Sequence, residues 1–145
     1  MNARVLVGIV GVATVALALV GLVAPASILP FTGLTPSLPT EPAGALGEVR
    51  AIYGGMLLAL GAFTLYAATN PWRHRLVLNL VGTVWLCVFG GRMLGIAIDG
   101  SPGLVGWGNA VLELVAAVAL LGAPAFGSAP GEPLPVPSAA APEPS

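Results

Sequence analysis

The chain has 145 residues, of which 57% are hydrophobic and only 8% are charged, and its formal net charge is −1. Soluble domains carry about 25% charged residues, so this composition favours a single domain that lies in a membrane. A slightly acidic chain offers no basic surface for nucleic acid. With one cysteine and one histidine, an intrachain disulfide is excluded, and we expect no metal site and no cofactor.

The first apolar segment covers residues 5–24, contains no charge and ends at Pro25. A helix crosses the hydrocarbon core with about 20 apolar residues, so this segment is long enough to span a membrane. A second interpretation is a signal peptide cleaved after Ala26, because Arg4 precedes the segment and Ala24-Pro25-Ala26 resembles a cleavage site. The apolar stretch is longer than the roughly 7–15 residues of a signal peptide, which favours an uncleaved helix.

A proline-containing loop is expected at residues 25–47. Three more spanning helices are predicted over residues 49–69, 76–98 and 104–123. Pro71 and Pro124 follow the ends of two of these helices, and proline disfavours helix in the residue before it. Because the last two connections are short, neighbouring helices must run antiparallel. The predicted fold class is therefore all-α, a membrane-spanning four-helix bundle of up-down-up-down topology. The remaining residues, 124–145, are rich in proline and alanine and are predicted to form a disordered tail.

The arginines predict an orientation. Arg4 precedes the first helix, and Arg73 and Arg75 lie between the second and third. Short loops rich in arginine stay in the cytoplasm, so both termini are expected there. The turn around Ser101 then lies outside.

Charged residues inside the predicted helices are the most informative feature of the chain, because such residues are costly in a bilayer and mark structural or functional sites. Arg92 and Glu113 lie at similar distances in sequence from Ser101. At ~1.5 Å rise per residue, their depths differ by only about 4–5 Å. The spacing predicts that the two side chains meet in the outer half of the bundle. The full candidate cluster comprises Glu48, Arg50, Tyr53, Arg92, Asp99, Asn109 and Glu113.

Two interpretations of this cluster stay open. It could be a structural ion pair that fixes helix register, or a binding or proton-handling site that opens to the outer face. Small residues predict where helices approach each other closely. The candidate packing positions are Ala51, Gly54, Gly55, Gly91 and Gly95.

The chain resembles a known family in the run Glu48-Val49-Arg50-Ala51-Ile52-Tyr53-Gly54-Gly55-Met56. This run is similar to the E-x-R-A-x-Y-G-G signature of a bacterial four-helix membrane family catalogued as domain of unknown function 4345. Gly91-Arg92, Asp99-Gly100 and Glu113-Leu114 resemble its G-R, D-G and E-L elements. The resemblance implies a multi-pass protein of the bacterial inner membrane whose charged cluster belongs to the family signature. It implies no catalytic residue.

Three functions remain in competition. The leading hypothesis is a non-enzymatic accessory or interaction protein, or a small binder, whose partners are the lipid bilayer and a second copy or another membrane protein. The alternative is a small oligomeric transporter or ion pathway in which Glu113 titrates and Arg92 holds a counter-charge. The third is a membrane enzyme acting on lipid or quinone, with Glu48 or Glu113 as general base. A dry, paired cluster would favour a structural role, and a wet funnel would favour transport or chemistry.

Overall fold

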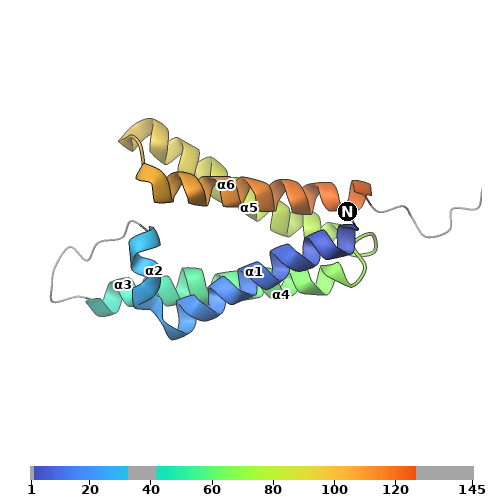
Figure 1. The fold of residues 1–145 in the computed structure, drawn as a ribbon, viewed down its shortest axis with the longest axis horizontal. Coiled ribbons are helices and arrows are strands. Elements are labelled where there is room, and N and C mark those ends of the chain that lie inside the picture. Colours follow the sequence, from blue (N-terminus) through green and yellow to red (C-terminus); the bar gives the residue numbers. More distant parts are fainter. Residues whose placement is uncertain (1, 33–41, 127–145) are drawn as a thin grey trace, which may run out of the picture.

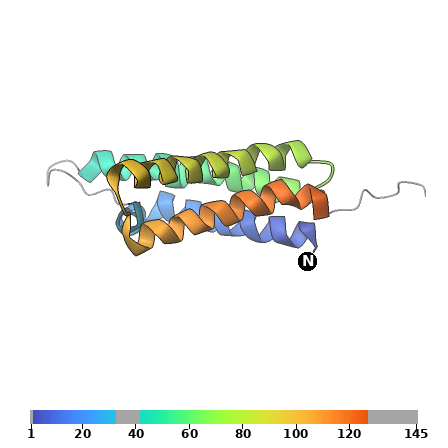
Figure 2. The same ribbon diagram turned by 90° about the horizontal axis from the view of Figure 1, so that it is seen from above.

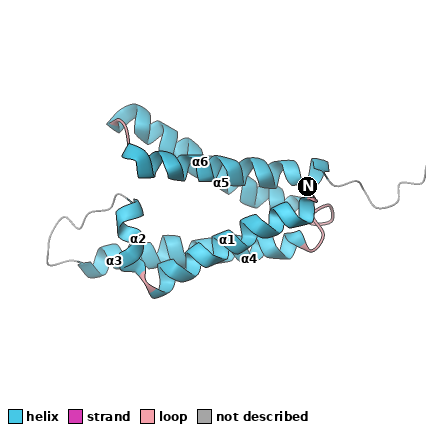
Figure 3. Cartoon of the chain, viewed as in Figure 1, coloured by secondary structure: helices cyan, strands magenta, loops and turns pink. Residues whose placement is uncertain are grey.

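The computed structural model describes residues 2–32 and 42–126. All regular elements in these ranges are helical (Figure 3). In chain order they are α1 (Ala3–Val23), α2 (Pro25–Thr32), α3 (Pro42–Val49), the π-helix η1 (Arg50–Met56), α4 (Leu57–Ala68), α5 (Arg75–Asp99), α6 (Gly103–Gly122) and the 3₁₀ helix η2 (Ala123–Phe126). Four helical segments are long and apolar enough to cross a membrane, namely Ala3–Val23, Gly44–Ala68, Arg75–Asp99 and Gly103–Gly122. The predicted all-α bundle is therefore confirmed, while most of the predicted disordered tail, from residue 127 onwards, lies outside the described residues.

The first helix begins and ends where its flanking residues dictate. The Asn2 side chain accepts a hydrogen bond from the backbone N–H of Arg4 and so caps the start of α1. The helix ends at Val23, and Pro25 opens α2, because proline is tolerated in a first helical turn. The loop predicted at residues 25–47 is therefore wrong over Pro25–Thr32 and Pro42–Gly47, which are helical.

The second span also differs from its prediction, because it is built from three consecutive segments. It begins in α3 rather than at Val49, passes through the π-helix η1, and continues as α4. The π-helix, Arg50–Met56, lies within the signature run. In a π-helix each N–H bonds the carbonyl five residues back, so each turn holds more residues than an α turn. Side-chain directions within the signature therefore depart from those of a regular α-helix.

The spanning helices form two pairs, α1 with α4 and α5 with α6 (Figures 1 and 2). The pairs come together at the end that holds the start of α1, the turn of residues 69–74 and η2, here called the closed end. They diverge toward the end that holds α2, α3 and the turn of residues 100–102, here called the open end (Figure 1). A cluster of buried hydrophobic residues lies at the closed end, where all four spanning helices contribute: Val7, Ala67, Leu78, Val81, Leu120 and Ala123.

Close approach of backbones joins α1 to the second span. A Cβ on Gly21 would lie 2.6 Å from the Tyr53 carbonyl oxygen, and one on Gly54 would lie 2.6 Å from Leu22 Cδ2. Gly54 thus lies where the second span approaches α1 closely. Ala51, Gly55 and Gly91 are exposed, and Gly95 is half-buried with only Asp99 of its own helix near an added Cβ. Gly55, Gly91 and Gly95 therefore make no close interhelical contact within the described chain.

Candidate functional site

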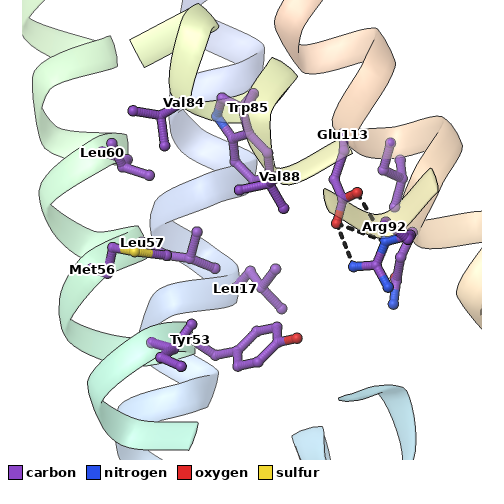
Figure 4. Close-up of a pocket in the computed structure, with 13 residues that line it drawn as sticks. Leu17, Tyr53, Met56, Leu57, Leu60, Val84, Trp85, Val88, Arg92 and Glu113 are labelled. Atoms are coloured by element: carbon purple, nitrogen blue, oxygen red, sulfur yellow. Dashed lines mark hydrogen bonds and ion pairs between the residues drawn. The ribbon is translucent and has the colours of Figure 1, made fainter. Parts of the chain in front are cut away.

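An ion pair joins α5 to α6 in the half of the bundle that leads to the open end. Arg92 Nε donates to both carboxylate oxygens of Glu113, at 2.9 and 3.2 Å, and Nη2 donates to Oε1 at 2.5 Å (Figure 4). It is the single salt bridge found across residues 2–32 and 42–126. The Glu113 side chain is only 8% exposed, whereas that of Arg92 is 25% exposed. The carboxylate is therefore covered, while part of the guanidinium reaches open space.

The short turn between α5 and α6 sets the register of this pair. Gly100 has φ of +96° and Gly103 has φ of +71°, both in the left-handed region that favours glycine. The chain therefore reverses within residues 100–102, and two antiparallel helices leave the turn side by side. Residues at similar distances from the turn then lie at the same depth, which is how Arg92 meets Glu113.

A cavity of about 140 Å³ lies beside the ion pair and is bordered by all four spanning helices. Its walls are mostly apolar, and 13 residues line it: Leu17, Ile52, Tyr53, Met56, Leu57, Leu60, Val84, Trp85, Val88, Arg92, Asn109, Leu112 and Glu113. On α5, Val84 lies toward the closed end and Arg92 toward the open end; on the second span, Leu60 and Tyr53 have the same order. The cavity is thus apolar at its deep end and polar toward the open end.

The π-helix contributes the polar wall opposite the ion pair. Tyr53 is half-buried, and its hydroxyl points across the cavity toward Arg92 and Glu113 (Figure 4). Asn109 lines the cavity from α6, and its Nδ2 donates a hydrogen bond of 3.0 Å to the Phe31 carbonyl in α2. The signature run and the ion pair therefore face one another across the same space.

The structure does not bring every member of the predicted cluster together. Glu48, Arg50 and Asp99 are exposed, and none of them lines the cavity or reaches the ion pair. A π turn holds more residues than an α turn. The angle between the Arg50 and Tyr53 side chains around the helix axis is therefore larger than it would be between residues i and i+3 of an α-helix. Asp99 is the last residue of α5 and lies at the open end.

Sequence reasoning did not identify the apolar cavity walls, among them Trp85 and Val88. In the described part of the chain, the Trp85 Nε1 atom is buried without a hydrogen-bond partner. Cys87 is exposed and lies outside the cavity lining. Across the described residues, no three His, Cys, Asp or Glu side chains lie close enough together to hold a metal ion. The described residues that line the cavity offer hydrogen-bonding groups and apolar surface.

No curated protein and no solved structure matches this chain. One family model does match it, over residues 2–123, and that family is described as domain of unknown function DUF4345. The matched range includes the four spanning helices, the π-helix and both members of the ion pair. The chain therefore belongs to the DUF4345 family.

Proposed function

We propose that this protein is a non-enzymatic membrane protein that binds a small amphipathic molecule between its two helix pairs. The observation that carries the proposal is the cavity itself, which combines apolar walls with a partly exposed Arg92–Glu113 pair at one end. Ligand sites are typically apolar cavities with a few convergent polar groups. An amphipathic molecule would place its apolar part toward Val84 and Leu60 and its polar group toward the ion pair.

The geometry of the ion pair indicates what kind of polar group fits. Glu113 occupies Nε and Nη2 of Arg92, so the Nη1 donors face away from the carboxylate. The pair as a whole is neutral, and a neutral pair attracts a strong anion less than a free arginine does. A carbonyl, ester or hydroxyl oxygen is therefore the favoured partner for Arg92 and Tyr53. Because both oxygens of Glu113 are engaged, the pair supports binding more than a proton or ion pathway.

The size of the cavity limits the buried part of the ligand. Its volume of about 140 Å³ is close to the ~150 Å³ of an engineered apolar protein cavity that binds benzene. The enclosed part of the molecule is therefore about as large as one six-membered ring or a short alkyl segment. Any longer apolar chain would extend between the diverging helix pairs into the surrounding lipid.

For the orientation, we propose that the closed end faces the cytoplasm of a bacterial cell and that the cavity lies in the outer half of the inner membrane. Arg4, Arg73 and Arg75 at the closed end support this, because arginine-rich short loops stay in the cytoplasm. With Cys87 replaced by serine, a cysteine at Ser101 should react with an impermeant reagent added outside intact cells. Reaction only after the cells are opened would contradict this orientation.

A pair of variants tests the ligand proposal. The protein is purified in mild detergent, and its small molecules are extracted and identified by mass spectrometry. Val88→Phe adds a ring inside the cavity, whereas Val118→Phe adds one on an exposed face of α6. We expect an amphipathic molecule to accompany the unmodified protein and Val118→Phe, and to be lost from Val88→Phe. Equal recovery from all three proteins would show that the cavity is not the site.

A further inference from the structure

The closed end carries positive charge that no acidic residue of the described chain offsets. Arg4, Arg73 and Arg75 are all exposed there. The start of α1 and the turn between α4 and α5 lie at the same end of the bundle (Figures 1 and 2). Within the described residues, the acidic side chains are Glu48 and Asp99 at the open end and Glu113 in the ion pair. Among the described residues, the closed end thus carries these arginines, whereas the open end carries Glu48 and Asp99 with Arg50 nearby.

Side chains within and beside the turn of residues 69–74 contact one another around Arg73 and around Arg75, the first residue of α5. Asn70 Oδ1 accepts a hydrogen bond of 3.2 Å from the Arg73 backbone N–H. The His74 ring lies 4.3 Å from the Tyr66 ring, between centroids, and the Arg75 guanidinium carbon lies 5.7 Å from the centre of the Trp72 ring. Stacking on an aromatic face fixes a guanidinium while leaving its N–H groups free to donate.

The composition of the turn places it at the depth of lipid headgroups. Tryptophan and tyrosine are enriched at the boundary between hydrocarbon and water, and Trp72 and Tyr66 are both exposed at this end. Arg73 and Arg75 flank His74 in the same turn, directly where α5 begins. His74 makes no side-chain cap there, and the Arg75 backbone N–H donates to the Trp72 carbonyl at 3.4 Å.

We propose that the closed end binds the phosphate groups of anionic phospholipids through Arg73 and Arg75, with Arg4 strengthening the attraction. Guanidinium groups match phosphate oxygens in a two-pronged geometry, and basic groups at the membrane boundary select anionic headgroups. This surface is separate from the cavity and does not depend on the ligand proposed for it. The chain contains a matched control in Arg50, which is also exposed but lies on the second span toward the open end.

The test compares lipid retention by native mass spectrometry. Full-length protein in mild detergent receives equal amounts of phosphatidylglycerol and phosphatidylcholine with identical acyl chains. We expect preferential retention of phosphatidylglycerol, weakened about fivefold for each arginine replaced in Arg73→Gln and Arg75→Gln. Arg50→Gln should retain the lipid as the unmodified protein does. The double variant Arg73→Lys with Arg75→Lys should keep most of the preference, since the charge remains, and thermal unfolding checks that every variant is folded.

Three outcomes would overturn the proposal. Equal retention of the two lipids would show that the closed end does not select anionic headgroups. An equal loss in Arg50→Gln would show that overall charge, rather than this turn, governs retention. In a third measurement, inorganic phosphate at millimolar concentration is added to the protein with its bound lipid, as a competitor. Complete displacement of the lipid by phosphate would indicate a site for the free anion, whereas retention of the lipid supports a membrane headgroup as the ligand.

Discussion

The two helix pairs are held together by different means. In the α1–α4 pair and the adjoining π-helix, backbones nearly touch, and an added Cβ on Gly11, Gly21 or Gly61 would lie less than 3 Å from a neighbouring atom. In the α5–α6 pair, Gly82 packs on Leu121 near the closed end, but the Arg92–Glu113 pair joins the helices farther along. Lipid is as apolar as the helices, so association rests on close packing or on polar contacts. The first pair is held mainly by close packing, and the second pair is held mainly by a polar contact.

The largest effect on stability is expected when one charge of the Arg92–Glu113 pair, which joins α5 to α6, is removed. Arg92→Leu leaves the buried Glu113 carboxylate unpaired and is expected to cost about 3–5 kcal/mol of unfolding free energy. Glu113→Leu leaves the partly exposed Arg92 unpaired and is expected to cost less. Replacing both with leucine should cost much less, because no unpaired charge remains. A double-mutant cycle in detergent, followed by thermal unfolding, measures the coupling. Additive losses would show that the pair does not hold α5 to α6.

Adding a methyl group at a glycine contact should have a smaller effect. In Gly21→Ala the new Cβ would meet the Tyr53 carbonyl, a backbone atom that cannot move aside easily. We expect a loss of about 1–3 kcal/mol, the usual range for overpacking. Gly91→Ala is the matched control, because nothing lies within 4 Å of its added Cβ. If thermal unfolding showed the same change for both, close packing would not be what distinguishes the first pair.

The smallest effect is expected for a buried hydroxyl in the first pair. Thr64 is 1% exposed, and its Oγ1 donates 2.7 Å to the Leu60 carbonyl of its own helix rather than to α1. Thr64→Val should therefore change stability by less than about 1 kcal/mol. Thr83→Val, on an exposed face of α5, is the comparison for thermal unfolding. A larger loss at Thr64 would mean that polar contacts matter in the first pair as well.

The positions of some charged residues could be predicted from the sequence, and those of others could not. The meeting of Arg92 and Glu113 follows from two regular helices and a short turn, because similar spacing from Ser101 then gives similar depth. The positions of Glu48 and Arg50 could not be predicted in the same way, since a π-helix changes the angle between successive side chains and leaves no mark in apolar periodicity.

The sequence also did not predict that α2 is helical, or which faces of the spanning helices pack against each other. Pro25 and Pro30 are typical of loops, yet proline fits the first turn of α2, and α2 continues through Pro30. Gly91 and Gly54 look alike in sequence, but only Gly54 meets another helix. Spanning helices are apolar on every side, so apolarity does not show which side faces protein.

The ion pair joins two consecutive helices, and this bears on how the chain enters a membrane. During synthesis α5 is complete before α6, and an arginine inside a lone spanning helix raises the cost of insertion, by up to about 2.5–3.5 kcal/mol at the helix centre. Glu113 comes within reach only after the turn at residues 100–102 has formed. Entry of α5 and α6 together, as one hairpin, neutralises both charges before either meets lipid. We therefore expect the last two helices to enter the membrane as a single unit, whereas the uncharged run of residues 5–23 can enter by itself.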